Sequence, residues 1–452
     1  MNKDLLSTIK PGTKILFANV PADGHFNPLT GLAVHLKNKG CDVRWYTSSA
    51  YQNKIEKMNI PFYGLKKAVD ISAHADLETI FPERKKYKTQ ISKLKFDIIN
   101  AFILRGPEYY EDIISIHKDF PFQVLVADIT FAAIPFVKEN MNIPVVAISV
   151  VPLPETSKDL PPSGLGMTPS FSFSGRLKQK LLRVIADKLI FAKPGRVMNK
   201  ILSSYGIDPG NANIFDIMIR KSTIVLQSGT PGFEYKRSDL SNHIHFIGPL
   251  LPYSQNTNRP AWYNEKVNQY KSVILVTQGT VEKDTEKLII PTLEAFSNSE
   301  HLVIVTTGGT KTEELRNRFP SDNIIIEDFI PFDDVMPYAD VYVTNGGYGG
   351  VLFSIKNELP MVAAGIHEGK NEINARIGFF KLGINLKTEK PKVEQIRASV
   401  EKVLCEPQYA ANVKKLSIEF QQYEPGELCE KYIKDLLPKK SRQWQTSPDY
   451  IL

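Results

Sequence analysis

Residues 14–28 read KILFANVPADGHFNP, and this stretch indicates how the chain begins to fold. The first seven residues are a short apolar run that is typical of a buried β-strand. Asn27 and Pro28 have the residue types of a helix N-cap and a first helical position, and apolar residues then recur at helical spacing until Gly40. The pattern predicts a strand, a loop that carries His25, and a helix that starts at Asn27-Pro28.

The same alternation of strand and helix continues through the first half of the chain. Further apolar runs of strand length lie at 42–47, 124–127, 145–150 and 223–227, and the last of these is predicted to be the final strand of this half. A helical pattern lies at 132–140. Strands that are separated by helices pair in parallel through right-handed crossovers, so the first half is predicted to be an α/β domain.

Two segments of this half are less regular. Residues 64–110 are polar and mostly helical in pattern, whereas residues 152–175 are rich in Pro, Gly and Ser and predict a long loop. A loop of this length inside a compact domain is usually functional.

The second half predicts another doubly wound parallel sheet. Its five expected strands are 273–277, 302–307, 324–327, 341–344 and 361–364. Its expected helices lie at 285–298, 332–337, 350–357, 370–381, 392–404, 408–422 and 426–436. The predicted organisation is a domain at 1–247, a linker at 248–270, a domain at 271–420, and a C-terminal helix and tail at 421–452 that pack back on the first domain.

Length and composition agree with a two-domain globular protein. The chain has 452 residues, of which 42% are hydrophobic and 23% charged. Its net charge of +7 suits an anionic small ligand. The surplus is taken to be spread along the sequence, without the dense basic block that nucleic-acid binding needs, so no nucleic-acid partner is expected.

The distribution of cysteines and apolar residues predicts a cytoplasmic protein. Cys41, Cys405 and Cys429 lie far apart and form no CxxC pair, which fits a reducing compartment. Residues 1–10 lack the apolar core of a signal peptide, and no apolar run reaches the ~20 residues of a membrane span.

Two ionisable residues follow predicted strands of the first half. His25 comes shortly after the strand at 14–20, and Asp128 directly follows the strand at 124–127. Because the carboxyl ends of parallel strands share one edge of a sheet, the pair could form a general base and its orienting carboxylate. Alternatively, His25 caps its helix and Asp128 belongs to a turn.

Glycine-rich turns follow three strands of the second half, at 278–280, 308–309 and 345–350. Small residues allow backbone N–H groups to approach an anion, and a helix start adds its positive end. The turns therefore predict a site for a phosphate-bearing ligand, although glycine also simply tightens turns. The sequence has no HExxH motif, and no carboxylates frame the only close histidine pair, His243 and His245, so no metal site is expected.

Several motifs together resemble the family-one (UGT-like) glycosyltransferases of GT-B fold, and most of all their bacterial natural-product members. Gly24-His25-Phe26-Asn27-Pro28 resembles the GHxxP start of that family. The second half resembles its nucleotide-sugar signature at 329–331, 336–340, 344–347, 360–362 and 368–376. The resemblance implies two Rossmann-like domains that face a central cleft, with an N-terminal acceptor domain and a C-terminal nucleotide-sugar domain.

The resemblance also implies a reaction. A hexose would pass, with inversion, from a UDP-sugar or dTDP-sugar to a hydroxyl of a small hydrophobic, phenolic or natural-product acceptor. His25 would be the general base and Asp128 would support it. The nucleotide sugar would be a co-substrate, with no separate cofactor and no metal, and the protein would be a monomer or a weak homodimer.

The resemblance carries over to individual binding residues. Those expected to contact the donor are Gly24, Gly279, Thr280, Phe329, Ile330, Asn345, Gly347, Gly349, Gly350, Glu368, Gly369 and Lys370. Phe81, Phe171 and Phe173 could form apolar walls of the acceptor site, or could be ordinary loop packing.

The sequence departs from the family pattern at four places in the donor region. Asn345 stands where many relatives have His, Gly349-Gly350 where they have Asn-Ser, Phe353 where plant members have Glu, and Gly369-Lys370 where well-known members have an acid and Gln. The sugar is therefore not predicted to be glucose in particular.

Two other functions remain open from the sequence. One is a catalytically idle nucleotide-sugar-binding helper of a partner enzyme. The other is a nucleotide-sugar epimerase of the same fold, for which Glu368 and Glu372 are the candidate acid and base groups.

Overall fold

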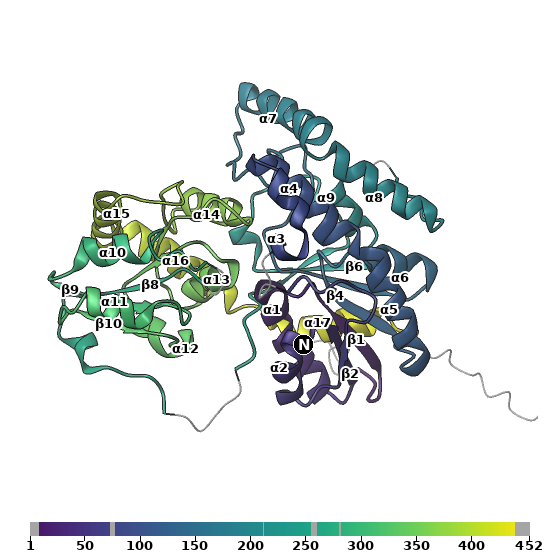
Figure 1. Ribbon diagram of the computed structural model, residues 1–452, viewed down its shortest axis with the longest axis horizontal. Helices are drawn as coiled ribbons and strands as arrows, with labels where there is room; N and C mark the ends of the chain where they lie inside the picture. The colour runs from purple at the N-terminus through teal and green to yellow at the C-terminus, as the bar shows by residue number, and fades with distance from the viewer. Residues whose placement is uncertain (1–8, 73–76, 211, 255–259, 280–281, 439–452) are drawn as a thin grey trace, which may run out of the picture.

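The computed structural model shows two α/β domains side by side, each built on a parallel sheet (Figure 1). It describes residues 9–72, 77–210, 212–254, 260–279 and 282–438. The N-terminal sheet has the strand order β3-β2-β1-β4-β5-β6-β7, and the C-terminal sheet has the order β10-β9-β8-β11-β12-β13. Both orders run outward in two directions from a central strand, which is the doubly wound arrangement predicted from the sequence.

The strands of the N-terminal sheet are short and mostly buried. They are β1 (Lys14–Ala18), β2 (Asp42–Thr47), β3 (Phe62–Gly64), β4 (Val124–Asp128), β5 (Val145–Ser149), β6 (Ile224–Ser228) and β7 (Ile244–Gly248). The prediction that the strand near 223–227 is the last was wrong, because β7 pairs with β6 in parallel. Its pattern is weak because it is an edge strand, in which His245 and Phe246 are only half-buried.

Helices surround this sheet. They are α1 (Asp23–Asn38), α2 (Gln52–Lys57), α3 (Leu77–Ile80), α4 (Gln90–Asp97), α5 (Arg105–Asp119), α6 (Ile134–Asn140), α7 (Phe173–Ile185), α8 (Ala192–Ser204) and α9 (Ile214–Arg220). Two π-helical segments extend α4 and α7, at Ile98–Ile103 and Ala186–Ile190. Along the whole described chain, in both domains, short 3-10 turns lie at Ser49–Tyr51, Pro82–Lys86, Pro231–Phe233, Glu265–Asn268 and Met336–Tyr338.

The first helix starts earlier than the sequence predicts. α1 begins at Asp23, with Ala22 in extended conformation as its N-cap, so Asn27 and Pro28 lie inside the helix. Pro28 is the sixth helical residue, and its missing N–H removes only one hydrogen bond, to the first turn. His25 is therefore not a loop residue but a member of the first helical turn, and its own N–H donates to the carbonyl of Ala22.

The C-terminal sheet has six strands among the described residues, one more than predicted. They are β8 (Ser272–Thr277), β9 (His301–Thr306), β10 (Ile324–Glu327), β11 (Val341–Thr344), β12 (Met361–Ala363) and β13 (Gly383–Asn385). The additional strand, β13, is three residues long and reads Gly-Ile-Asn, which gives no strand pattern by itself.

The helices of the second half of the chain lie close to their predicted positions, with α11 as an additional one. They are α10 (Ile289–Phe296), α11 (Thr312–Arg318), α12 (Phe332–Val335), α13 (Tyr348–Lys356), α14 (Lys370–Phe379), α15 (Val393–Cys405), α16 (Pro407–Phe420) and α17 (Pro425–Leu436).

Apolar clusters lie on both faces of each sheet, because alternate residues of a strand point to opposite sides. In β1, Leu16 and Ala18 belong to one cluster, and Ile15 and Phe17 belong to the other. Burial of these faces is the main stabilising term of the fold. The described residues include no helix that is long and apolar enough to cross a membrane.

The last helix of the chain leaves the C-terminal domain. α17 lies beside α1, under the N-terminal sheet (Figure 1). Its buried Glu430 accepts a hydrogen bond from the backbone N–H of Ile9 at 2.9 Å. The predicted tail beyond this helix, 439–452, lies outside the described residues.

Candidate functional site

His25 and Asp128 meet at the carboxyl edge of the N-terminal sheet. Asp128 is the last residue of β4, which pairs with β1, and His25 lies in the helical turn that follows β1. His25 Nδ1 lies 3.0 Å from Asp128 Oδ1. The adjacency of two parallel strands therefore brings together two residues that are 103 positions apart in the sequence.

Other hydrogen bonds hold the Asp128 carboxylate in place. The side chain is fully buried, and its Oδ2 accepts the backbone N–H of Val20 at 2.7 Å. Its Oδ1 accepts the backbone N–H of Thr130 at 2.9 Å and the Thr130 hydroxyl. A buried carboxylate with these donors is satisfied and keeps a single orientation.

This arrangement leaves one nitrogen of His25 free to react. With Nδ1 donating to Asp128, Nε2 carries the lone pair of the neutral ring. The His25 side chain is 20% exposed, and its Nε2 has no hydrogen-bond partner within the described parts of the chain. The geometry can remove a proton from a hydroxyl group that is placed beside Nε2.

A small apolar cluster adjoins the strand that leads to His25. It contains Val20, which follows β1, together with Ile71 and Ala101, and Phe81 packs against it. Phe81 also makes an edge-to-face contact with Phe96 at 6.2 Å between ring centroids. Of the three predicted acceptor residues, Phe81 is the one that the structure brings to this side of the domain.

Arg105 is a buried charged residue that none of the sequence motifs indicates. Its side chain is 8% exposed, and Nη2 pairs with Glu108 at 3.0 Å. Nε and Nη1 have no hydrogen-bond partner among the described residues, and the guanidinium carbon lies 5.8 Å from the Phe81 ring centroid. A charged residue directly after the apolar run 98–104 was the available signal in the sequence.

The structure does not support Phe171 and Phe173 as acceptor walls. Phe171 is 51% exposed, and Phe173, the first residue of α7, is 87% exposed. Neither belongs to an apolar cluster of the described residues. The loop prediction for this region was correct as far as Ser172, where the N-cap of α7 begins.

The glycine-rich turns after β8 and β11 converge on Asn345. The Asn345 side chain donates to the carbonyl oxygen of Gln278, which links the two turns. Its amide oxygen lies 3.9 Å from the positions that a Cβ would occupy at Gly279 and at Gly347. Thr280, the next residue predicted to contact the donor, lies outside the described residues.

Gln278 is a second residue whose role only the structure shows. Its side-chain oxygen accepts the backbone N–H groups of Leu288 and Ile289, at 3.0 and 2.9 Å, where α10 begins. The side-chain N–H donates to the carbonyl of Asp284 at 2.9 Å. Gln278 thus fixes the turn that carries Gly279.

The helix that follows β11 presents its positive end to this place. Gly347 is the N-cap of α13, and Tyr348, Gly349 and Gly350 form its first turn, whose N–H groups have no partner within the helix. A Cβ atom added at Gly349 would have no other atom within 4 Å. A Cβ atom added at Gly350 would lie 2.9 Å from the Tyr342 hydroxyl. Backbone donors beside open space suit a phosphate.

Phe329 and Ile330 have different environments. Phe329 is 69% exposed, and its ring lies 3.8 Å from a Cβ position at Gly309, in the turn after β9. Ile330 is buried in the core of the C-terminal domain. An exposed ring over a glycine turn offers a flat surface for a nucleobase, whereas Ile330 can contribute only through its backbone.

The segment before α14 brings together the last three predicted donor residues. Gly369 is the N-cap of α14 with φ of +78°, and Lys370 is its first residue. Lys370 Nζ pairs with Glu368 Oε2 at 2.7 Å. The Lys370 side chain is 13% exposed and passes over Gly365, so it is not a freely solvated lysine.

Ionic contacts connect the two domains beside this segment. Glu372 Oε1 accepts the backbone N–H groups of Gly164 and Gly166, at 2.9 and 2.8 Å, from the long loop of the N-terminal domain. Glu372 Oε2 pairs with Arg376, which also binds buried Glu234 at 2.8 Å. Burial would lower the pKa of Arg376, but the two carboxylates outweigh it and raise that pKa.

One group of possible metal ligands occurs within the described ranges, and it lies away from these turns. His35 Nε2, Glu427 and Glu430 lie where α1 meets α17. Lys39 Nζ contacts both carboxylates, at 2.9 and 3.3 Å. The ammonium group already supplies the positive charge there, so the group is an ion-pair cluster.

Comparison with known protein families gives a match over the larger part of the chain. The sequence model of a family described as "UDP-glucoronosyl and UDP-glucosyl transferase" matches residues 121–425. A 4'-demethylrebeccamycin synthase from Lentzea aerocolonigenes is 32% identical over 410 residues, which are 90% of this chain and 96% of that protein. UDP-glucosyltransferase 1 from Beauveria bassiana is 29% identical over 93% of this chain and 94% of its own.

Solved structures give the same fold. The calicheamicin glycosyltransferase CalG4 has a TM-score of 0.74 at 18% identity and aligns with 95% of this chain and all of its own. The glycosyltransferase of kitacinnamycin has a TM-score of 0.73, with the same identity and coverage. These likenesses confirm the predicted GT-B fold.

Proposed function

This chain belongs to the UDP-glucoronosyl and UDP-glucosyl transferase family and is a glycosyltransferase, and we propose that it transfers a hexose with inversion to a hydroxyl of a small apolar acceptor. The nucleotide of the donor would be UDP or dTDP. The acceptor would be a phenolic compound or another hydrophobic natural product. We further propose that the reaction takes place in the cytoplasm.

The observation that carries the proposal is the contact between His25 and Asp128. An imidazole held by a buried carboxylate, with its other nitrogen free, has the geometry of a general base. Phe81, which is partly exposed and packs against the buried cluster of Val20, Ile71 and Ala101, would form an apolar wall of the acceptor site.

The proposed step is a single displacement. His25 Nε2 takes the proton of the acceptor hydroxyl, whose oxygen attacks the anomeric carbon of the donor. The bond from that carbon to the β-phosphate oxygen breaks, and the nucleoside diphosphate leaves with the electron pair. Asp128 stabilises the imidazolium that forms.

The donor would bind along the glycine-rich edge of the C-terminal domain. The first turn of α13 and the turn that carries Gly279 would bind the diphosphate through backbone N–H groups. Phe329 would stack on the pyrimidine, and the Glu368–Lys370 pair would contact the sugar.

The structure gives less support to the two alternatives. A nucleotide-sugar-binding helper would not need a buried carboxylate to orient a histidine at the acceptor side. An epimerase would need free acid and base groups in the donor region, whereas Glu372 is bonded to Gly164, Gly166 and Arg376, and Glu368 is paired with Lys370.

His25→Ala tests the proposed function. Transfer should fall by ~10²–10⁴-fold, as is typical when a general base is lost. Affinity for UDP, measured by calorimetry, should stay nearly unchanged, because His25 lies in the other domain. An acidic phenol should lose less activity than an aliphatic alcohol, since it needs less help from a base. Transfer to an aliphatic alcohol at the wild-type rate would disprove the role of His25.

A further inference from the structure

The outer side of α7 and of the π-helical segment that extends it is an apolar surface in contact with solvent. Phe173 is 87% exposed, Leu177 61%, Leu181 59% and Leu189 67%. Val184 is exposed as well. Because residues three or four positions apart share one face of a helix, these side chains form a continuous stripe.

The opposite side of the same helix faces the protein and makes polar contacts with it. Gln179 is buried, accepts the Ser170 N–H at 2.6 Å and donates to the Asp159 carbonyl at 3.1 Å. Arg183 donates to the carbonyl of Leu160. The inner side thus contacts the domain through these polar groups and through buried Ala186, while the large apolar side chains of the stripe lie outside.

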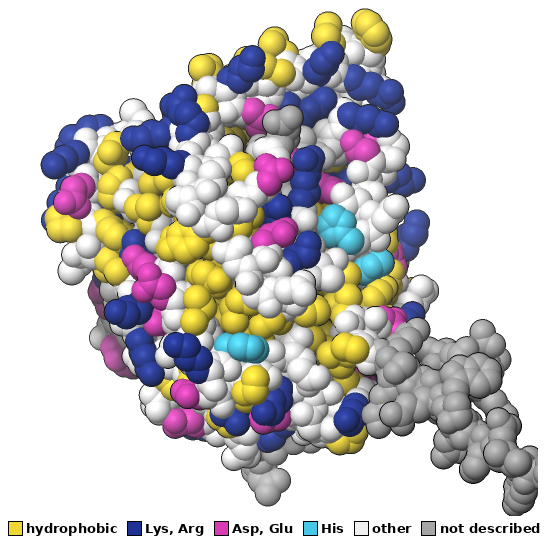
Figure 2. Space-filling view, turned by 90° about the vertical axis from the view of Figure 1, so that its right-hand side faces the viewer, with side chains coloured by type: hydrophobic (Ala, Val, Ile, Leu, Met, Phe, Trp, Pro, Cys, Tyr) yellow, Lys and Arg dark blue, Asp and Glu magenta, His cyan; other side chains and the backbone are white. Residues whose placement is uncertain are grey.

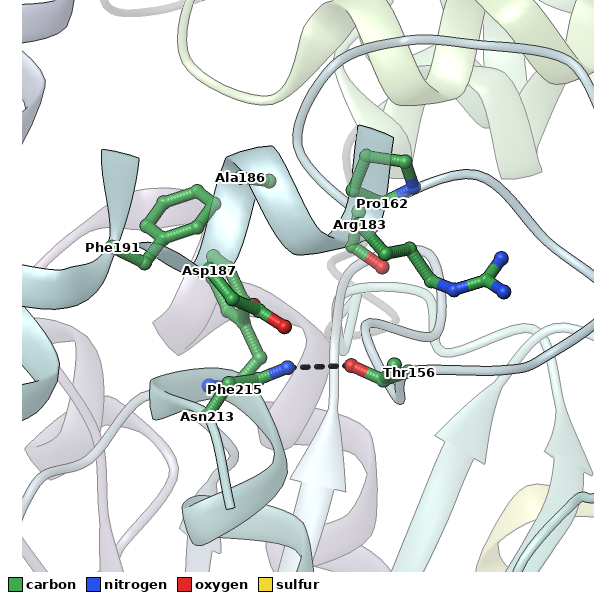
Figure 3. Close-up of a pocket in the computed structure, with 9 residues that line it drawn as sticks. Thr156, Pro162, Arg183, Ala186, Asp187, Phe191, Asn213 and Phe215 are labelled. Atoms are coloured by element: carbon green, nitrogen blue, oxygen red, sulfur yellow. Dashed lines mark hydrogen bonds between the residues drawn. The ribbon is translucent and has the colours of Figure 1, made fainter. Parts of the chain in front are cut away.

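Figure 3 shows what lies beneath this helix. Arg183, Ala186 and Asp187 come from α7 and its π-helical extension and line a pocket together with Phe191 and Phe215. None of the exposed apolar residues of the stripe lines this pocket. The residues of this helix that line the pocket thus lie on its inner side, whereas the apolar side chains of the stripe are exposed.

The same region holds the charge surplus of the protein. Residues 171–200 include eight Lys or Arg and a single acidic residue, Asp187, for a net charge of +7. This value equals the net charge of the whole chain, so the expectation that the surplus is spread along the sequence was wrong. Figure 2 shows hydrophobic side chains interspersed with Lys and Arg along the top of the molecule, where α7 lies in Figure 1.

A neighbouring helix widens this surface. Ile91 and Leu94 of α4 are 52% and 45% exposed. Lys95 Nζ donates to the carbonyl of Leu189 at 2.8 Å, which joins α4 to the end of the stripe. We use the term α7 surface for the exposed apolar residues of α4 and 173–189 with their flanking Lys and Arg side chains.

We propose that the α7 surface docks the N-terminal domain on an anionic lipid bilayer. Phe and Leu side chains would enter the boundary between headgroups and acyl chains, and the flanking lysines and arginines would pair with lipid phosphates. The helix would lie in the plane of the interface without spanning the membrane. Docking would bring the acceptor-binding domain to a source of water-insoluble acceptors.

Charge distinguishes this occupant from two others. A second copy of the chain seated on the α7 surface would bring two regions of charge +7 together, which is electrostatically unfavourable. Nucleic acid would satisfy the basic side chains but would leave the apolar stripe against phosphates and water. An anionic bilayer satisfies both kinds of side chain.

Vesicle sedimentation tests the proposal on the full chain. The protein should pellet with vesicles of phosphatidylcholine and phosphatidylglycerol, and much less with phosphatidylcholine alone, and added salt should weaken the binding. Two double variants, Leu177→Ser with Leu181→Ser and Lys178→Glu with Lys180→Glu, should each reduce the partition coefficient by at least about tenfold.

Matched controls come from the other domain. Ile418→Ser removes an apolar side chain that is 50% exposed in α16, and Lys402→Glu reverses a charge on α15. Both should bind vesicles as the wild type does. All variants should keep the wild-type melting temperature and the wild-type transfer to a water-soluble acceptor.

Several results would overturn the proposal. One is a wild-type protein that does not pellet with anionic vesicles, and another is equal binding by the α7 variants. In a third, light scattering shows that the wild-type protein is a dimer and the α7 variants are monomers, and neither the wild type nor the variants bind vesicles. The α7 surface would then be a protein interface. Binding to a short single-stranded DNA instead of vesicles would assign the surface to nucleic acid.

Discussion

At the scale of single residues, Lys370 lies where the sequence departs from its relatives. Its ammonium group pairs with Glu368 at 2.7 Å, and its aliphatic part lies against Gly365, which follows the strand next to β11. Asn345, at the end of β11, is close to the same glycine. The positive charge is therefore held beside the glycine-rich edge at which we propose that the diphosphate binds.

Lys370→Gln should change the choice of donor. A charged hydrogen bond is worth ~1–3 kcal/mol, and an amide both donates and accepts, so the ratio of kcat/KM between competing NDP-sugars should shift. The measurement is competition between two donors, with UDP affinity followed in parallel. Lys356→Gln, at the last turn of α13, is the control. An unchanged donor ratio together with unchanged UDP binding would exclude Lys370 from the donor site.

At the scale of elements, the start of α13 replaces a metal ion in the proposed chemistry. Its first-turn N–H groups have no partner within the helix, and a Cβ atom built at Gly349 would have no other atom within 4 Å. These donors can stabilise the charge that develops on the leaving diphosphate.

Activity should therefore survive EDTA. Neither Asp-x-Asp nor a His and carboxylate set lies beside the described glycine-rich turns. The test measures initial rates after chelation and after return of Mg²⁺ or Mn²⁺. Loss of turnover with EDTA and recovery with Mn²⁺ would contradict stabilisation by the helix alone.

A second element, α14, holds the long loop of the other domain. Gly166 has φ of +63°, and a Cβ there would lie 2.7 Å from the Cβ of Asn371, so only glycine permits this close approach. Two loop N–H groups donate to Glu372. The loop is thus attached to the helix that carries Lys370.

Glu372→Ala should release this loop. Amide hydrogen exchange should rise in the peptide that contains Gly164 and Gly166, because both N–H groups lose a charged acceptor. KM for the acceptor should rise while UDP affinity changes little. Glu394→Ala, in the first turn of α15, is the control. Unchanged exchange in the loop would show that Glu372 does not hold it.

At the scale of the whole molecule, α17 near the C-terminus binds residues near the N-terminus of the chain. Glu430 is 6% exposed and binds the Ile9 N–H, His35 and Lys39. Burial alone would raise the pKa of Glu430, but these hydrogen bonds and the Lys39 charge outweigh it and hold the pKa below 4.5. Such a group stabilises the folded state above its unfolded pKa, and the stabilisation is lost as the pH falls through the folded value.

Glu430→Gln should accordingly lower the melting temperature more at pH 7 than at acid pH. At pH 7 the loss of a charged hydrogen bond should cost ~1–3 kcal/mol, and the difference from wild type should narrow below about pH 4.5. Thermal unfolding of both proteins across this range measures the difference. A constant difference at every pH would mean that the charge of Glu430 contributes nothing to the docking of α17.

The sequence by itself determined the features that depend on local pattern. Apolar runs such as KILFANV predicted most of the strands, because a strand that is buried on both faces must be apolar throughout. The order of strands and helices then required parallel sheets, and the motif at 24–28 indicated the family. The short edge strands β3, β7 and β13 were missed because they are only partly buried and carry a weak pattern.

Only the tertiary structure decided which distant residues meet. The contact of His25 with Asp128 depends on the pairing of β1 with β4, and that of Glu372 with Gly166 depends on how the two domains lie together. The helix α7 is the clearest case, because its sequence shows an amphipathic helix but not that its large apolar side chains stay exposed. Helical periodicity fixes the relative positions of side chains, whereas burial depends on what packs against the helix.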